Sequence, residues 1–280
     1  MKHLSTVVST MRTAALAVAF GVCVGDASPA LAQTSDPAAT FVETPAANRT
    51  GGDDSWDITL GAGGGVTSAY PGSRALRGTG VPMFSISYRD TVFLNAQGLG
   101  INVVDTHGFK TGPILTYDVN RDEKWDTRLR GMGDVEYALA GGAFLSYGYG
   151  PFDVTTIVKQ AITHMNYGLS GSVEANYHGS ITSDLSFQIG PDMEFGNANF
   201  ERTWFGVSSD QSQRSGLRAY HARAGVQDVG VHAGLTYNWS AHSVIQIFAG
   251  AKELVSSAAD SPLVQRKTEA LAGLGIAYHF

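Results

Sequence analysis

The sequence predicts an all-β protein: a transmembrane, antiparallel, up-and-down β-barrel of about 12 strands, within a range of roughly 10–14. Three observations lead to this prediction. Apolar and polar residues alternate along most of the chain after residue 55, as in strands with one face in lipid and the other in a lumen. Charged residues make up only 16 % of the chain, and glycine is abundant at 34 residues. Aromatic residues stand near the ends of the predicted strands, where membrane-interface girdles occur.

The last ten residues show the alternation most clearly. Leu274, Tyr278 and Phe280 fall on one face of a strand, and Ala277 falls on the other. A soluble antiparallel sheet has the same pattern, so this stretch alone leaves both interpretations open. We expect the strand to close the barrel by pairing with the first strand, which starts at Trp56, and we interpret Tyr278 and Phe280 as the barrel-assembly signal.

The alternation predicts twelve strands separated by turn-forming residues. They cover residues 56–67, 79–88, 91–104, 108–118, 133–147, 152–162, 167–178, 181–189, 220–226, 229–239, 243–254 and 271–280. Their polar faces carry Asp, Glu, His, Gln and Asn in mid-strand, whereas the inner face of a soluble sandwich is apolar. The aromatic residues at or near strand ends are Tyr88, Tyr117, Tyr147, Tyr167, Tyr177, Tyr237, Trp239, Tyr278 and Phe280. Because a sheet in lipid can leave no edge unpaired, we expect it to close.

The sequence leaves open which side of the membrane the long connections occupy. Counting twelve strands back from a periplasmic C-terminus places residues 119–131 and 196–217 on the periplasmic side, although periplasmic turns are usually short. If residues 220–239 formed one strand, both connections would lie outside. One further strand would then have to be gained or lost elsewhere.

Residues 1–32 have the features of a signal peptide. Lys2 and Arg12 supply positive charge, residues 13–25 form an apolar run, and residues 30–32, Ala-Leu-Ala, form a small-x-small cleavage site. The segment predicts export through the Sec pathway to the cell outer membrane.

The rest of the chain divides into two predicted parts. Residues 33–54, rich in Ala, Thr, Pro and Asp, are predicted to be a disordered periplasmic leader, and residues 55–280 the barrel. A lipoprotein signal at Cys23 is the alternative to cleavage after Ala32. Cleavage leaves no cysteine and 17 basic against 24 acidic residues, which argues against a nucleic-acid partner.

Several short motifs lie in the connections. They are Tyr70-Pro71-Gly72-Ser73, Gly98-Leu99-Gly100, Asn120-Arg121-Asp122-Glu123 with Asp126, Leu129 to Glu136, Phe205-Gly206-Val207-Ser208, Ser215-Gly216-Leu217 with Tyr220, Ala224 to Val229, and Asp260 to Val264. Together and in this order, they resemble the MipA/OmpV family of outer-membrane proteins. The resemblance spans residues 56–280.

This resemblance implies a non-enzymatic role. The founding member looks like a scaffold that joins a lytic transglycosylase to a bifunctional penicillin-binding protein during peptidoglycan (murein) growth. We therefore expect an adaptor with those enzymes, outer-membrane lipid, lipopolysaccharide and the barrel-assembly machinery as partners. The candidate partner-contact residues are Arg121, Asp122, Glu123, Asp126, Asp134, Phe205, Tyr220, Asp228 and Asp260. Other members are described as adhesins or porin-like proteins, so a passive or substrate-selective pore and a surface adhesin remain alternatives.

The charged stretch after residue 117 begins like a calcium-binding loop. Asp118, Asn120 and Asp122 have the required spacing, but Glu123 replaces the necessary glycine and Leu129 the bidentate carboxylate. We expect a solvated loop of mixed salt bridges or a partner-binding edge, and no metal site.

No catalytic constellation emerges from the histidines. His164, His178, His232, His242 and His279 lack a Ser and an acid at workable spacing, and there is no Gly-x-Ser-x-Gly elbow. His178 and His232 fall on the presumed lumen face, where a satisfied polar network explains them. We predict no enzymatic activity and no cofactor. Because about twelve strands enclose a lumen wider than side chains fill, either loops plug it or it conducts.

Overall fold

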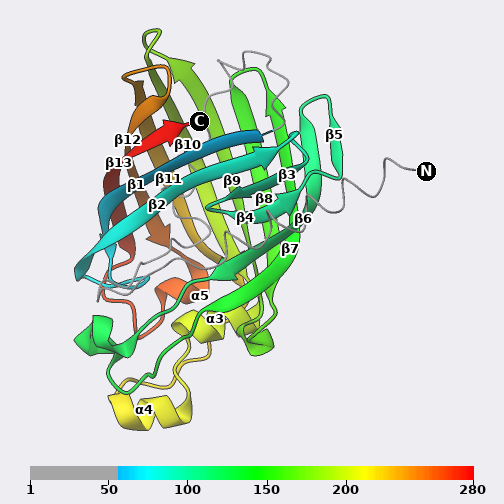
Figure 1. Ribbon diagram of the computed structural model, residues 1–280. Helices are drawn as coiled ribbons and strands as arrows, with labels where there is room; N and C mark the ends of the chain where they lie inside the picture. Colours follow the sequence, from blue (N-terminus) through cyan, green and yellow to red (C-terminus); the bar gives the residue numbers. More distant parts are fainter. Residues whose placement is uncertain (1–55) are drawn as a thin grey trace, which may run out of the picture.

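Residues 56–280 are described by a computed structural model, in which an antiparallel β-barrel carries a helical layer at one end (Figure 1). The predicted signal peptide, residues 1–32, and the predicted leader, residues 33–54, lie outside the described residues. None of the described helices is both long and apolar enough to cross a membrane.

The barrel wall is one closed sheet. Its strands are β1 (Trp56–Ser68), β2 (Leu76–Tyr88), β3 (Val92–Asn95), β4 (Gly98–Ile101), β5 (Val104–Thr106), β6 (Phe109–Asp118), β7 (Ala138–Tyr149), β8 (Phe152–Ala161), β9 (Leu169–Ser180), β10 (Leu185–Gly196), β11 (Gly225–Asn238), β12 (Ser243–Leu254) and β13 (Thr268–His279). β1 pairs with β13, and β4 pairs with β6, which closes the sheet. Because β5 continues β4 along the same edge of β6, twelve strands surround the lumen. The predicted pairing of the last strand with the first is confirmed, with Leu60 opposite Tyr278.

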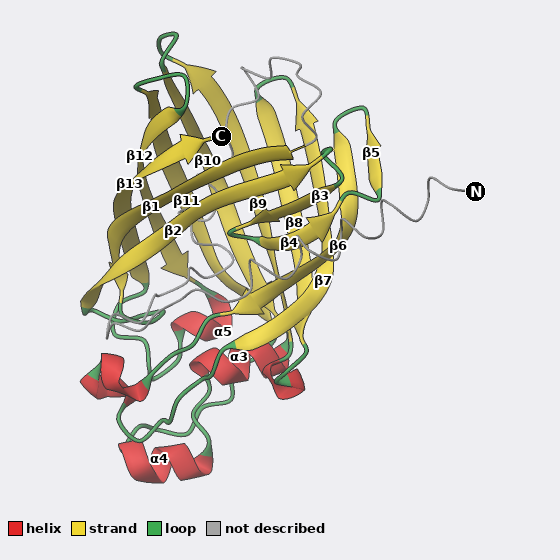
Figure 2. Ribbon diagram, in the orientation of Figure 1, coloured by secondary structure: helices red, strands yellow, loops and turns green. Residues whose placement is uncertain are grey.

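The helices within residues 56–280 all lie at one end of the barrel (Figure 2). They are η2 (Glu123–Trp125), η3 (Thr127–Leu129), η4 (Met165–Tyr167), α3 (Ala198–Phe205), α4 (Ser209–Ser215) and α5 (Ser256–Ala259). We call this end the loop end, and its connections, residues 69–75, 119–137, 162–168, 197–224 and 255–267, the cap. The opposite end, the turn end, carries the start of β1, the C-terminus and the short turns 89–91, 107–108, 150–151, 181–184 and 239–242.

The strand prediction was wrong in two places, and the two errors cancel in the count. Residues 91–104 form the β3–β4 hairpin and β5 rather than one strand, because Gln97 N donates to the side chain of Asn95 in a turn that ends at Gly98, where φ is +142°. Residues 225–238 form the single strand β11 rather than two strands. The pairing with β10 shifts there because Gln227 is an extra residue, a β-bulge that reverses the alternation.

Strand boundaries also differ from the prediction. The strand predicted from residue 133 begins at Ala138, because the preceding residues belong to the cap. β10 continues to Gly196, beyond its predicted end at residue 189. Pro191 has no N–H to donate, so pairing with β9 is interrupted between Ile189 and Asp192, but the strand goes on.

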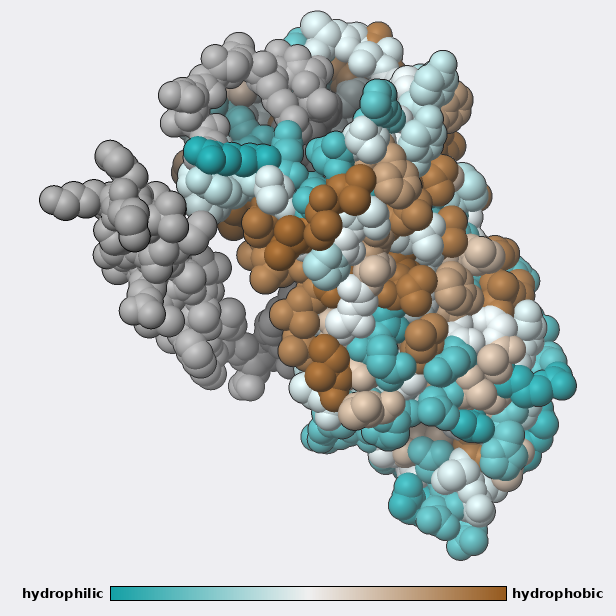
Figure 3. All heavy atoms as spheres, turned by 90° about the vertical axis from the view of Figure 1, so that its right-hand side faces the viewer, coloured by the Kyte–Doolittle hydropathy of each residue, from teal (hydrophilic) through white to brown (hydrophobic). Residues whose placement is uncertain are grey.

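The outer face of the barrel is apolar, as predicted. Leu274 on β13 is 59 % exposed, and many Leu, Ile, Val and aromatic side chains share its orientation. Figure 3 shows apolar residues gathered around the middle of the molecule and hydrophilic residues over the loop end. Two residues of the predicted aromatic girdle do not belong to it. Tyr117 and Tyr167 pack against an apolar cluster of the cap instead of facing lipid.

Aromatic rings lie flat against glycines on the inner face. Phe248 stands opposite Gly273 across β12 and β13, and Phe195 stands opposite Gly171 across β9 and β10. A Cβ atom added at either glycine would collide with the facing ring. These glycines therefore let large side chains fold onto the wall and fill the interior.

A Gly273→Val substitution is expected to destabilise the barrel by about 1–3 kcal/mol, because the new side chain overpacks against Phe248. Urea unfolding in detergent micelles, followed by tryptophan fluorescence, measures the change. Gly80→Val on β2 is the matched control, since no atom lies within 4 Å of a Cβ added there. Equal unfolding midpoints for the two variants would contradict the packing argument.

Candidate functional site in the cap and the lumen beneath it

Two apolar clusters hold the cap together. The first consists of Val119, Val135, Phe200, Trp204, Phe205, Ala222, Leu254, Ala258 and Ala259, and the second of Ala69, Tyr70, Leu129, Met132, Val207 and Leu263. Their members come from connections far apart in the sequence, so the cap is a packed layer rather than a set of separate loops. α3 packs against β9, β10, β11 and α5. The charged residues beneath it, Asp118, Lys159, Glu194 and Asp228, are buried, so the cap shuts this end of the lumen.

Arg121 is an internal support of the cap rather than a surface group. Its side chain is 2 % exposed, and its Nη1 donates to the carbonyl of Trp204 at the end of α3, at 2.6 Å. The backbone of Arg121 also pairs with that of Val135. Burial lowers the pKa of the Arg121 guanidinium to about 10. The residue ties the connection 119–137 to α3.

The acidic candidates nearby bind backbone N–H groups. Glu123 Oε1 and Oε2 accept from the N–H of Gly131 and Gly133, each at 2.8 Å, and these two bonds lower the pKa of Glu123. Asp134 Oδ1 accepts from the N–H of Glu123 at 2.7 Å. The expected loop of mixed salt bridges is thus a loop fastened by carboxylate–backbone bonds.

Asp122 and Asp126 start the two short helices of the same connection. Asp122 Oδ1 accepts from Lys124 N at 2.8 Å, and Asp126 Oδ1 accepts from Arg128 N at 2.9 Å. Asp126 Oδ2 also accepts from the hydroxyl of Ser73 at 2.8 Å, which joins this connection to the one after β1. Both carboxylates shape the cap.

Three further candidates have different positions in the cap. Phe205 is fully buried in its apolar core. The hydroxyl of Tyr220 donates to the carbonyl of Ser257 at 2.7 Å, and Tyr220 pairs through its backbone with Val207. The Asp260 side chain is exposed, lies 3.9 Å from Lys267 Nζ, and remains accessible to a partner.

Asp228 belongs to the lumen rather than the cap. Its carboxylate, with those of Asp192 and Glu194, surrounds the ammonium of Lys252 at N–O distances of 3.8, 3.4 and 3.5 Å respectively. Gln227, the bulge residue, donates to both Glu194 and Asp228, at 3.0 and 2.8 Å. Three carboxylates and one amide from β10 and β11 therefore meet around one cation from β12.

The polar network predicted for His232 is confirmed. Its Nδ1 lies 3.2 Å from Asp192 Oδ1, and its Nε2 lies 2.7 Å from Asn176 Oδ1. Asn176 also donates to Glu174 at 2.9 Å and to Asp153 at 3.2 Å, and Asp153 contacts His178. A chain of polar groups thus runs along the inner face from the turn end toward α3, and its members Asn176, Asp192 and His232 are buried.

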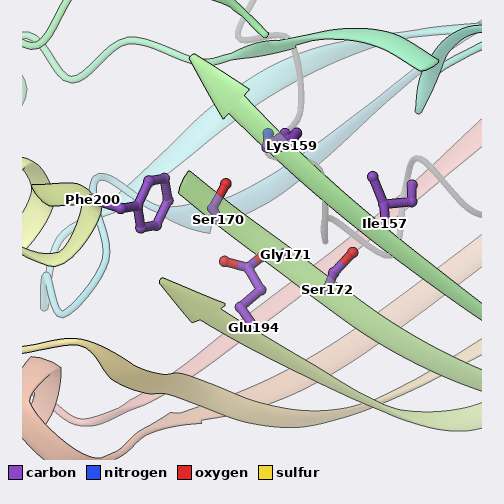
Figure 4. A pocket seen from close by; sticks show the side chains of 7 residues that line it. All are labelled: Ile157, Lys159, Ser170, Gly171, Ser172, Glu194 and Phe200. Carbon is purple, nitrogen blue, oxygen red and sulfur yellow. The ribbon is translucent and has the colours of Figure 1, made fainter. Parts of the chain in front are cut away.

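Small cavities lie between this network and the cap. Figure 4 shows one of them, with Ser170, Ser172 and Glu194 on neighbouring strands and Phe200 of α3 at its loop end. A second adjoins Trp204 and shares Lys159, Glu194 and Phe200 with the first. Lys159 is held by Asp118, at 2.5 Å. α3 therefore lies between the charged lumen and the rest of the cap.

Glu201 was not among the predicted site residues. It lies on α3 and is 1 % exposed, and neither carboxylate oxygen has a hydrogen-bond partner. Burial, reinforced by the neighbouring charges of Glu194 and Asp228, raises the pKa of Glu201 to about 8. A helical period in residues 200–205, which places Glu201 on the same side as Trp204 and Phe205, is the sequence signal that could have revealed it.

Residues 60–280 match the family model described as MltA-interacting protein MipA. The chain belongs to this family. Family membership and the closed barrel together make it an outer-membrane barrel protein, and the resemblance inferred from the motifs is confirmed.

Solved structures offer more distant similarities. The chain is 10 % identical to the NanC porin, covering 78 % of this chain and 98 % of that one, with a TM-score of 0.41. It is 10 % identical to the COG4313 outer membrane channel from Pseudomonas putida F1, covering 85 % and 100 %, with a TM-score of 0.44. The N-terminal β-barrel domain of Pseudomonas aeruginosa OprF gives 17 % identity, 51 % and 88 % coverage and a TM-score of 0.26. No curated protein matches the chain.

The family motifs in this chain thus gather mainly in the cap. Arg121, Glu123, Asp126 and Phe205 are brought together there by packing and backbone hydrogen bonds, while Asp228 lies apart in the lumen. No group of His, Cys, Asp or Glu within the described residues is arranged to hold a metal ion. The chemistry of these residues supports the architecture of the cap.

Phe205→Ala is expected to destabilise the cap by about 3–5 kcal/mol, because it leaves a cavity in the apolar core. Limited trypsin digestion should cut faster at Arg202, Arg214 and Arg218, while the heat-modifiable mobility of the barrel persists. Met165→Ala, at a 74 % exposed cap residue, is the control and should leave cleavage unchanged. Equal cleavage rates for the two variants would show that the cap does not depend on this core.

Proposed function

We propose that this protein is a non-enzymatic outer-membrane adaptor whose turn end binds a peptidoglycan enzyme. The family description, MltA-interacting protein, suggests the partner class: a lytic transglycosylase of the MltA type. A penicillin-binding protein, implied by the sequence resemblance, is the second enzyme that such an adaptor would gather.

The closed loop end favours an adaptor over an open pore. α3 and the apolar clusters cover the lumen, and the inward carboxylates of Asp192, Glu194 and Asp228 are engaged with Lys252 rather than lining an open passage. Side chains that bond to one another in this way stabilise the barrel wall and do not line a channel. They leave the two ends of the barrel as the surfaces available for contact.

The positions of the long and short connections support an assignment of sides. Outer-membrane barrels keep short turns in the periplasm and long loops outside. The turn end, with the start of β1 and the C-terminus, then faces the periplasm, and the cap faces outward. Because peptidoglycan enzymes work in the periplasm, we place the contact at the turn end. The acidic motif of the cap would lie on the other side of the membrane.

An acidic surface at the turn end carries this proposal. Among the described residues there, Asp57, Asp90, Asp105 and Asp184 oppose only two lysine or arginine side chains, Arg89 and Lys110. Arg89 and Asp90 project from a tight turn, where both have φ of 52°. Such a surface selects a partner with a basic face and accelerates its association. The experiment must therefore distinguish the two ends and then their charges.

Single cysteines at the two ends should react from opposite sides of the membrane. With Cys23 replaced by Ser, Asp210→Cys in α4 is expected to react with a membrane-impermeant maleimide on intact cells. Asp184→Cys, in the turn between β9 and β10, should react only after the outer membrane is permeabilised. The reverse pattern would place the cap in the periplasm and refute the proposed orientation.

Removing the turn-end charges should weaken enzyme binding. The triple variant Asp90→Asn, Asp105→Asn and Asp184→Asn is expected to lower the affinity for a purified MltA-type lytic transglycosylase by about tenfold or more, mainly through slower association. Surface plasmon resonance at several salt concentrations measures both rates. Asparagine suits the positive φ of Asp90, so the turn is preserved.

The matched control removes three carboxylates from the cap instead. Asp134→Asn, Asp210→Asn and Asp260→Asn together change the net charge by the same amount and should leave the affinity unchanged. Equal losses of affinity in both triple variants would show that binding depends on net charge and not on the turn end. The absence of binding by the unmodified protein would refute the adaptor proposal itself.

A further inference from the structure

α3 carries a buried carboxyl group that nothing neutralises. Glu201 stands beside the buried pair Phe200 and Trp204, and its Oε1 would lie 3.0 Å from a Cβ added at Gly196, so the side chain turns back over the end of β10. Both oxygens lack a hydrogen-bond partner. An ionised carboxylate in this position is costly, because neither water nor a donor solvates it.

The charges that face Glu201 are mainly negative. β10 contributes Glu194, β11 contributes Asp228, and η4 contributes the titratable Tyr167 with His164 stacked on it. β9 contributes only the hydroxyls of Ser170 and Ser172 near the cavities, and α5 has no charged residue.

The nearby cations are already engaged elsewhere. Lys252 lies among Asp192, Glu194 and Asp228, Lys159 is held by Asp118, and Arg121 donates to the carbonyl of Trp204. None of these contacts reaches the Glu201 carboxyl. Glu201 is thus placed where its neutral form fits and its ionised form is repelled by Glu194 and Asp228.

We propose that α3 is a proton-controlled gate, which closes the loop end of the lumen while Glu201 is protonated and is released when Glu201 loses its proton. Release turns Glu201 toward water and uncovers the charged lumen below Phe200. This activity is additional to enzyme binding at the turn end. The barrel is then open at the loop end only while Glu201 is ionised.

The direction of the pH effect follows from the two states of the carboxyl. In the closed cap the pKa of Glu201 is about 8, whereas its ordinary value, expected once it is released, is 4.5. The closed state therefore binds the proton more tightly and is fully favoured at low pH. As the pH rises from 4.5 to 8, the ratio of open to closed molecules should increase by about tenfold per pH unit, and then level off.

A cysteine beneath the gate tests this dependence. Ser170 is 5 % exposed and lies below Phe200 (Figure 4), so Ser170→Cys reports opening through its rate of modification by a maleimide. The rate is measured in the otherwise unmodified protein and in Glu201→Gln, in which residue 201 stays neutral. Dividing the rate in the otherwise unmodified protein by the rate in Glu201→Gln at each pH cancels the titration of the thiol itself. This quotient should rise by about tenfold per pH unit between pH 5.5 and 7.5.

Controls keep the outcome specific to Glu201. Glu253→Gln, an exposed carboxylate on the outer side of β12, should retain the full pH dependence. If Glu201→Gln does not give a heat-modifiable barrel, Glu201→Leu provides the neutral reference. A quotient that stays constant with pH, or a cysteine that remains unreactive up to pH 9, would overturn the gate. Enzyme binding at the turn end is measured separately, so either proposal can fail without the other.

Discussion

The closure of the sheet is the constraint on which this structure depends. Lipid offers no partner to a backbone N–H or C=O, so each strand must be paired on both sides within the hydrocarbon region. β1 and β13 meet along eight residue pairs, and the short strand β4 completes the circle by pairing with β6. The closed barrel has an apolar outer face. The side chains of its inner face must fill the lumen, bond to one another or contact solvent.

The interior is occupied in two ways. On one part of the wall, rings such as Phe248 lie over glycines, which brings apolar volume into the lumen. On another part, carboxylates, amides and His232 bond to one another around Lys252. Burying charges is costly unless they are paired: Asp192, Glu194 and Asp228 share the ammonium of Lys252, whereas neither oxygen of Glu201 has a hydrogen-bond partner. Glu201 lies on α3, between the lumen and the rest of the cap, where movement changes access.

The residues that mark the family motifs and those that fit the proposed partner contact are at opposite ends. Arg121, Glu123 and Asp126 are engaged in holding the cap, so their chemistry is explained by architecture. In the proposed orientation, the acidic turn end lies where a periplasmic enzyme would meet the barrel. The cap and the turn end can therefore have different functions. One barrel can combine a gate at the cap with an adaptor surface at the turn end.

The sequence by itself determined the fold class, the approximate strand number and the closure, because side-chain alternation is a local property that lipid and lumen impose on every strand. It also indicated the family through motifs in the connections. Only the tertiary structure decided that Gln227 is a bulge, since a bulge exists relative to the opposing strand β10. The burial of Arg121, the packing of the cap and the isolation of Glu201 depend likewise on residues distant in the chain. Burial and neighbouring charge determine what a carboxyl group does, and both arise only when those distant segments meet.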